Sequence, residues 1–209
     1  MSGDVVLVHG LWMPGIVMAP LARRLRKRGY RTHTFTYRGR CGTLKAHGER
    51  LARFASELAA SGPVHYVGHS MGGLVVLAAL AEPTDPPPAS VVLLGAPVCG
   101  CLSARRLGCV APGRWMLGDS EPLWHEHPRP DWRAKAPLGV VAGTKPSFGF
   151  GRLLGGLPGA NDGVVRLDET DVNAMTDRIV LPVSHTGLMF STRVEAHAAH
   201  FLAHGHFEK

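Results

Sequence analysis

One stretch decides the fold: Val64-His65-Tyr66-Val67-Gly68-His69-Ser70-Met71-Gly72-Gly73-Leu74-Val75-Val76. Residues 64–67 are β-branched or aromatic and predict a short buried strand. Residues 74–81 are all apolar, which predicts a helix that is buried on every side. Between them, residues 68–72 match the pattern G-x-S-x-G, in which a strand turns directly into a helix.

The chemistry of this turn points to Ser70. A strand that turns at once into a helix holds its middle residue in strained backbone space, and Gly68 and Gly72 have no Cβ to clash there. Ser70 also lies at a helix N-terminus, where free N–H groups favour a developing negative charge. The alternative is an ordinary glycine-rich turn, but the flanking strand, the helix and Gly73 favour a nucleophile at Ser70.

The bulk composition is that of a globular protein. The chain has 209 residues, of which 45% are hydrophobic and 19% charged, and no apolar run is long enough to span a bilayer. We therefore expect a single domain over residues 1–209 and no transmembrane segment. Because the first expected strand, residues 4–8, leaves no room for a secretion signal before it, we expect a cytoplasmic protein.

The net charge of +7 raises the question of a nucleic-acid partner. Its densest run, residues 23–28, has the apolar spacing of one amphipathic helix, and no nucleic-acid recognition motif accompanies it. We therefore expect no nucleic-acid binding.

The cysteine and histidine spacings do not match a metal site. Cys99 and Cys101 are too close for an easy disulfide, and neither they nor Cys41 and Cys109 form a paired C-x-x-C. We expect free, mostly buried thiols. The histidines at 125 and 127 and at 197, 200 and 204 lack the H-E-x-x-H pattern, so no metal is expected.

Strands and helices alternate along the chain. Apolar runs predict strands at residues 4–8, 30–37, 64–67, 90–97, 138–143 and 178–183. Helices are expected from Pro20 to Gly29, from the cap residue Thr43 to Gly62, after Ser70, and as one terminal helix over residues 188–201. This alternation predicts an α/β protein with a parallel sheet, helices on both faces and a site at the carboxyl ends of the strands.

Residues 98–136 interrupt this regularity. They contain Trp115, Trp124 and Trp132 among prolines and arginines, without a long periodic helix. Such an insert predicts a cap or lid over a substrate pocket. The alternative is an irregular layer that only packs on the body.

A serine nucleophile needs a base and a third group that orients the base. Of the 12 histidines, His185 follows the last strand in a short loop, at the sheet edge that also carries Ser70. His9 and His69 flank glycines in turns, where we expect the side chain to be incidental. The acid should lie between serine and histidine in the sequence. Asp162, in an Asn-Asp-Gly turn after a strand, is favoured, and Asp168 is the alternative.

The oxyanion formed when Ser70 attacks a carbonyl needs two hydrogen-bond donors. The backbone N–H of Met71, which follows the nucleophile, supplies one. Leu11, in the loop just after the first strand, is the expected second.

Four pieces of the sequence resemble α/β-hydrolases, in particular small bacterial lipase- and esterase-like members. They are Val8-His9-Gly10, the turn of residues 68–72 (called the elbow below) with Gly73, Asn161-Asp162-Gly163 and Ser184-His185-Thr186-Gly187-Leu188. The resemblance covers nearly the whole chain in order. It implies a minimal α/β-hydrolase fold with a mostly parallel sheet of about six strands. It also implies Ser70 as nucleophile, His185 as base, Asp162 as acid, and Leu11 and Met71 as oxyanion donors.

The expected function is a serine hydrolase that cleaves carboxylic esters through an acyl-enzyme, with no cofactor. Its partner would be a small-molecule acyl ester or thioester. A thioesterase or acyltransferase would use the same triad. A non-catalytic ligand-binding protein of the same fold is the alternative from another class, but such proteins usually lose a triad member. The sequence predicts no particular oligomeric state.

Overall fold

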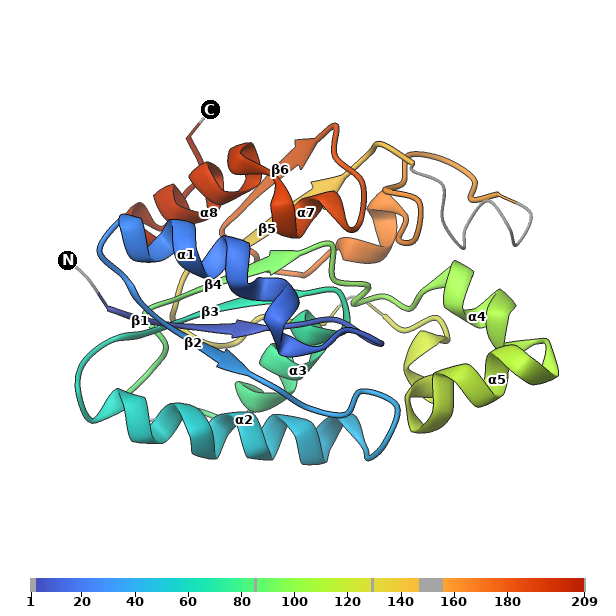
Figure 1. Cartoon of the computed structure of the whole chain (residues 1–209), viewed down its shortest axis with the longest axis horizontal. Coiled ribbons are helices and arrows are strands. Elements are labelled where there is room, and N and C mark those ends of the chain that lie inside the picture. Colours follow the sequence, from blue (N-terminus) through green and yellow to red (C-terminus); the bar gives the residue numbers. More distant parts are fainter. Residues whose placement is uncertain (1–2, 85, 129, 147–155, 209) are drawn as a thin grey trace.

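The computed structural model describes residues 3–84, 86–128, 130–146 and 156–208. Its centre is a sheet of six parallel strands in the order β2-β1-β3-β4-β5-β6 (Figure 1). The strands are β1 (Asp4–Val8), β2 (Arg31–Phe35), β3 (Val64–His69), β4 (Ser90–Leu94), β5 (Leu138–Gly143) and β6 (Asp177–Leu181). The predicted α/β fold with about six strands is confirmed, and the sheet is parallel throughout.

Helices cover both faces of this sheet. In Figure 1, α2 and α3 lie below it, and α1, α7 and α8 lie above it. The α-helices are α1 (Ala19–Lys27), α2 (Leu44–Ala59), α3 (Met71–Ala79), α4 (Leu102–Gly108), α5 (Ala111–Leu117), α7 (Gly187–Phe190) and α8 (Thr192–His204). The 3-10 helices are η1 (Gly15–Met18), η2 (Gly118–Trp124) and η3 (Leu167–Thr170).

The strand alternation divides the core into two layers. Val6 and Val8 of β1 belong to the cluster that contains Leu51 of α2. Val5 and Leu7 belong to the opposite cluster, with the side chains of α1 and α8. Because alternate side chains of one strand point to opposite faces, a strand covered on both sides must be apolar throughout.

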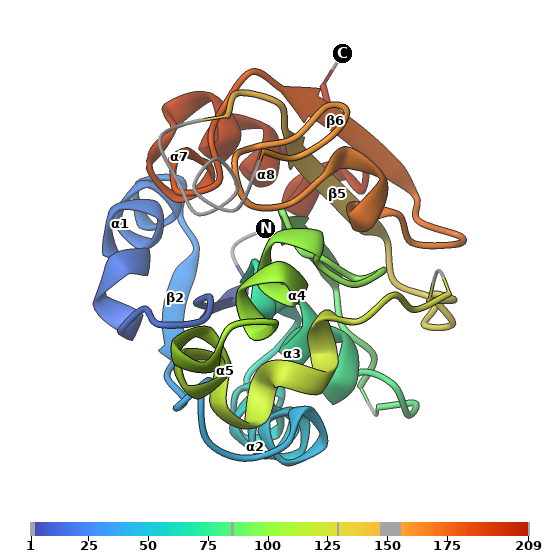
Figure 2. The same cartoon turned by 90° about the vertical axis from the view of Figure 1, so that its right-hand side faces the viewer.

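Between β4 and β5, the helices α4 and α5 lie beyond the carboxyl ends of the strands. Figure 2 looks at this end of the molecule and shows α4 and α5 in front of the sheet. Both helices and η2 are seven residues long, consistent with the absence of long periodicity in residues 98–136. We call residues 98–136 the cap segment below.

Two sequence predictions about this architecture are wrong. The single terminal helix over residues 188–201 is two helices, because Ser191 is extended (φ −68°, ψ 127°) and its Oγ caps α8 by accepting from Val194 N. The thiols are free but not mostly buried, since Cys41 and Cys109 are exposed. Most of the glycine-rich stretch 145–160 lies outside the described residues.

Candidate active site

Ser70 lies on the strained turn that the sequence predicts. It joins β3 directly to α3 with φ 53° and ψ −127°, one of three non-glycine residues with positive φ among those described. Its backbone N–H donates to the carbonyl oxygen of Leu94 at 2.9 Å, which ties the turn to the end of β4. A non-glycine residue persists in this backbone region only where the surroundings enforce it, and such residues cluster at functional sites.

Two glycines beside Ser70 leave no space for a side chain. A Cβ on Gly68 would lie 2.6 Å from Gly73 Cα, and a Cβ on Gly72 would lie 2.3 Å from the carbonyl oxygen of Val8. In both cases the obstacle is backbone, which cannot swing away as a side chain can. The elbow spacing is therefore a consequence of close backbone packing.

Asp162 and His185 form a buried pair. Asp162 Oδ2 lies 2.7 Å from His185 Nδ1, and the two residues are 1% and 7% exposed. The other carboxylate oxygen, Oδ1, accepts from Val164 N at 3.0 Å and Val165 N at 2.8 Å. The backbone N–H of His185 also donates to the backbone carbonyl oxygen of Asp162 at 2.9 Å. Because Nδ1–H donates to the carboxylate, the lone pair of the neutral ring is on Nε2.

Ser70 and His185 line the same cavity, whose volume is about 310 Å³. The loops at the carboxyl ends of the strands and the cap segment both contribute to its wall. The cap segment supplies apolar side chains together with a thiol and a hydroxyl, from Cys101, Ser103, Ala104, Leu107, Leu117 and Trp124. The cavity suits a mostly apolar small molecule.

The two expected oxyanion donors lie in the elbow and in the loop after β1. Met71 is the first residue of α3, where backbone N–H groups have no intrahelical acceptor. Leu11 lines the cavity, and a Cβ on the preceding Gly10 would lie 3.1 Å from Ser70 Cβ. The loop after β1 is thus packed against the elbow.

Asp168, the alternative acid, lies apart from this arrangement. Its exposed carboxylate pairs with Arg166, whose Nε donates to Oδ1 at 2.9 Å. This ion pair lowers the pKa of Asp168. Of the two candidates, the structure brings only Asp162 to His185.

The expectation that the side chains of His9 and His69 are incidental is wrong. His69 Nε2 lies 3.0 Å from the carbonyl oxygen of His185, and the two rings are 4.7 Å apart. Complete burial lowers the pKa of His69 to about 3, so the neutral ring donates this bond. Its position just before Ser70, in a buried strand, was the available signal, because a buried imidazole needs a partner.

Glu169 is a second residue that sequence reasoning missed. It lies in the largely polar stretch 168–177, yet it is only 7% exposed. Its carboxylate accepts from Leu102 N and Arg166 N, both at 2.7 Å. Burial raises the pKa of this carboxyl. Glu169 therefore anchors the start of α4 in the cap segment to the loop that carries Asp162.

The described residues contain no group of three or more histidine, cysteine, aspartate or glutamate side chains arranged to hold a metal ion. In the same part of the chain, every helix is too short or too polar to cross a membrane.

The sequence matches the profile of the Alpha/beta hydrolase family over residues 5–205. The chain belongs to this family. No curated protein matches the sequence.

Solved α/β-hydrolase structures share this fold at low identity. The mature form of the lipase BlEst2 from Bacillus licheniformis is 18% identical, with a TM-score of 0.75, and the match covers 97% of this chain and 91% of that one. The match to the propeptide form covers only 47% of that longer chain. A pyrethroid hydrolase from Sphingobium faniae is 16% identical with a TM-score of 0.60, and the match covers 98% of both chains.

A monoglyceride lipase from Saccharomyces cerevisiae is 14% identical with a TM-score of 0.66, and the match covers 100% of this chain and 88% of that one. At such identities the likeness shows the fold, and function must be argued from the site.

Proposed function

We propose that this α/β-hydrolase cleaves carboxylic esters through an acyl-enzyme on Ser70, with His185 as base and Asp162 as the group that orients it. The 2.7 Å hydrogen bond between buried Asp162 and His185, in a loop that shares a cavity with Ser70, carries the proposal. Structural neighbours described as lipases and as a pyrethroid hydrolase support an ester substrate.

In this mechanism, His185 Nε2 takes the proton of the Ser70 hydroxyl as Oγ attacks the carbonyl carbon. The imidazolium then gives the proton to the leaving alcohol, and the ester bond breaks to leave acyl-Ser70. His185 next removes a proton from water as the water oxygen attacks the acyl carbon. It then returns this proton to Ser70 Oγ as the acyl–oxygen bond breaks, which releases the acid and restores the free serine. Asp162 stabilises the imidazolium in both steps and keeps the ring in one tautomer.

The negative oxygen formed in each step accepts hydrogen bonds from the backbone N–H groups of Leu11 and Met71, which stabilise it. The acyl group is assigned to the apolar part of the cavity, with the cap segment as its outer wall. A lid function of residues 98–136 is part of this proposal.

Labelling with a fluorophosphonate tests the nucleophile. The wild-type protein should take up one label per chain and hydrolyse p-nitrophenyl esters, and Ser70→Ala should lose both properties. Ser103→Ala is the matched control, because its hydroxyl lines the same cavity but donates to the carbonyl oxygen of Val164 at 2.6 Å. It should still be labelled. Absence of label on the wild-type protein, or equal labelling of Ser70→Ala, contradicts the proposal.

Replacing the acid tests its assignment. Asp162→Asn should lower kcat by about 10⁴-fold with the fold intact, since loss of the carboxylate favours the wrong imidazole tautomer. Asp168→Asn should stay within about twofold of wild type, because that exposed carboxylate pairs only with Arg166 among the contacts described above. Steady-state kinetics, with circular dichroism as the folding control, decides. The assignment is wrong if Asp162→Asn keeps full activity and Asp168→Asn loses it.

A further inference from the structure

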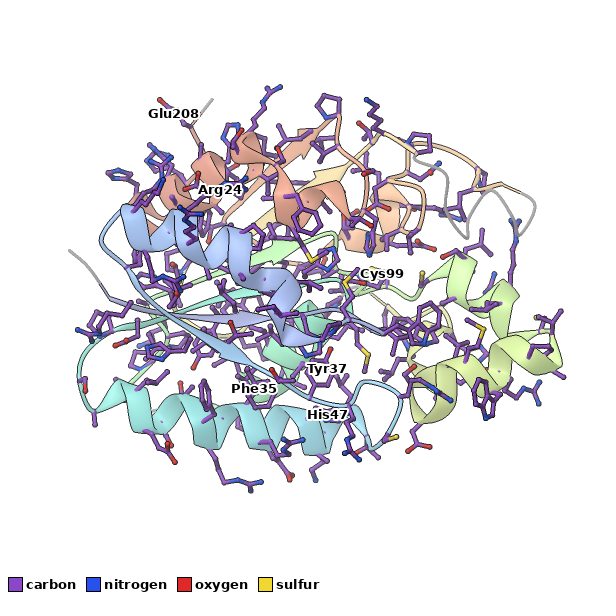
Figure 3. The ribbon with its side chains drawn as sticks, in the orientation of Figure 1. Arg24, Phe35, Tyr37, His47, Cys99 and Glu208 are labelled. Carbon is purple, nitrogen blue, oxygen red and sulfur yellow. The ribbon has the colours of Figure 1, made fainter. Side chains whose placement is uncertain are left out.

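The loop after β1 is held by an aromatic side chain that the proposed chemistry does not use. Tyr37 follows β2 and is 5% exposed. Its ring is stacked on His9 with 4.7 Å between centroids and 17° between planes. Figure 3 shows Tyr37 near Phe35 and His47. The ring centroids of Tyr37 and His47 are 4.8 Å apart. Tyr37 thus links the start of α2 to the loop beside Ser70.

Two hydrogen bonds tie Tyr37 to His9. The Tyr37 hydroxyl donates to the carbonyl oxygen of His9 at 2.9 Å, and the Tyr37 backbone N–H donates to His9 Nε2 at 3.3 Å. A backbone N–H can only donate, so Nε2 must be the acceptor and the ring proton must be on Nδ1. His9 Nδ1–H therefore donates to the carbonyl oxygen of Gly10 at 2.9 Å.

This last bond fixes the direction of the Gly10–Leu11 peptide. In a trans peptide the C=O and the following N–H point in opposite directions. A Gly10 carbonyl held by the His9 ring therefore turns the Leu11 N–H away from that ring. Within the part of the chain that the structure describes, the Leu11 N–H donates no hydrogen bond. Leu11 lines the cavity and Gly10 is packed against Ser70.

We propose that Tyr37 and His9 are positioning residues that aim the Leu11 N–H at the oxyanion. Tyr37 acts through His9, and His9 acts through the Gly10 carbonyl. The inference rests on the proposed function but assigns roles to two further side chains.

The protonation states are consistent with this chain of bonds. Burial lowers the pKa of His9, which keeps the ring neutral with a single donor. Burial also raises the pKa of the Tyr37 hydroxyl, which therefore remains a donor at any pH at which the enzyme is assayed. The relay needs a His9 ring with a single donor and a Tyr37 hydroxyl that keeps its proton, and both pKa shifts favour these forms.

Tyr37→Phe removes only the hydroxyl and tests the first link. Full loss of one oxyanion donor costs about 10²–10³-fold in kcat, so a misaimed donor should cost about tenfold, with KM changed less than twofold. The affinity for an alkyl boronic acid, whose tetrahedral serine adduct places an oxygen where the oxyanion forms, should fall by the same factor. Tyr30→Phe is the matched control, because Tyr30 is a buried tyrosine at the opposite end of β2. Tyr30→Phe should leave kcat and the boronic acid affinity within twofold of the wild-type values.

Two replacements of His9 test the second link. Asparagine can place its amide donor near the position of Nδ1, whereas glutamine extends to the position of Nε2. His9→Asn should therefore keep at least fivefold more activity than His9→Gln. This pair also decides the matter if Tyr37→Phe does not fold.

The outcomes separate this inference from the proposed function. If wild type is labelled at Ser70 and active, but Tyr37→Phe keeps kcat within twofold, the positioning role is wrong and the hydrolase stands. A loss of kcat without loss of boronate affinity also overturns the role, since it would reflect a general structural effect. Equal losses in the two His9 variants overturn the second link. An unlabelled, inactive wild type overturns both proposals.

Discussion

Gly72 at the elbow and Gly108 in the cap segment occupy opposite kinds of surroundings. A Cβ on Gly72 would lie 2.3 Å from a backbone oxygen of β1, whereas a Cβ on Gly108 would meet Leu117 Cδ1 at 3.4 Å, an ordinary contact. The elbow is held by backbone packed directly on backbone. At Gly108 the nearest atoms belong to side chains, which can adjust, whereas Gly100, Gly113 and Gly118 of the same segment are packed against backbone as Gly72 is.

Some outer contacts between the cap segment and the body are made by side chains. The Trp12 indole N–H donates to the carbonyl oxygen of Met116 at 2.8 Å, and Gly42 N donates to Asp119 Oδ2 at 2.7 Å. Both bonds lie at exposed positions. The cap segment is therefore held to the body partly by such exposed bonds and partly by backbone contacts, such as the Asp119 N–H that donates to the carbonyl oxygen of Arg40 at 2.9 Å.

Alanine substitutions at these two glycines test the comparison most directly. Gly72→Ala should destabilise the protein by about 3 kcal/mol or more, because neither the new Cβ nor the β1 backbone can move without disturbing the sheet. Gly108→Ala should stabilise it by about 0.5 kcal/mol, since alanine loses less backbone entropy in a helix. Urea unfolding followed by circular dichroism measures both free energies.

Equal and small effects of the two substitutions would mean that the elbow can relax, and the strain argued for Ser70 would then be absent. A large loss from Gly108→Ala would mean instead that the surroundings of Gly108 are as tightly packed as those of Gly72.

The sequence predicted best what backbone geometry controls. The strands, the Thr43 cap of α2 and the turn at Ser70 follow from local patterns of apolar residues and glycines, and the structure contains all of them. The pairing of Asp162 with His185 followed from topology, because both loops end strands at the same edge of one parallel sheet.

What could not be predicted depends on contacts between segments far apart in the chain. The role of Glu169 requires knowing that α4 starts beside it. The bonds of His69 and His9 require the positions of the His185 loop and of Tyr37. The helix ends before Ser191, a good N-cap residue, and this local signal was missed because apolar residues continue on both sides of it. Hydrogen bonds between polar side chains and distant backbone groups produce no periodic pattern in the sequence, so they cannot be predicted from it.

Acid titration sharpens the same comparison through the histidines. Burial lowers the pKa of His65 to about 4 and that of His69 to about 3, and both residues belong to β3 of the body. The unfolded chain takes up these protons near pH 6.5, and the folded protein does not. Their stabilising contribution is therefore complete above pH 6.5 and is lost as the pH falls toward 4 and then 3. The free energy of unfolding should fall by about 1.4 kcal/mol per pH unit for each histidine.

A single substitution in each region isolates this effect. His65→Asn can still bond Ser90 Oγ, which lies 2.7 Å from His65 Nδ1 in the wild type, but it cannot titrate. Between pH 6 and pH 4.5 its stability should therefore fall less steeply than that of the wild type, by one histidine's share of the slope. His127→Asn, at an exposed position of the cap segment, is the matched control that removes a histidine outside β3, and its slope should match that of the wild type. Urea unfolding at several pH values gives the slopes. Equal slopes in all three proteins would show that the body does not exclude protons from its histidines, and the tight packing inferred around β3 would be wrong.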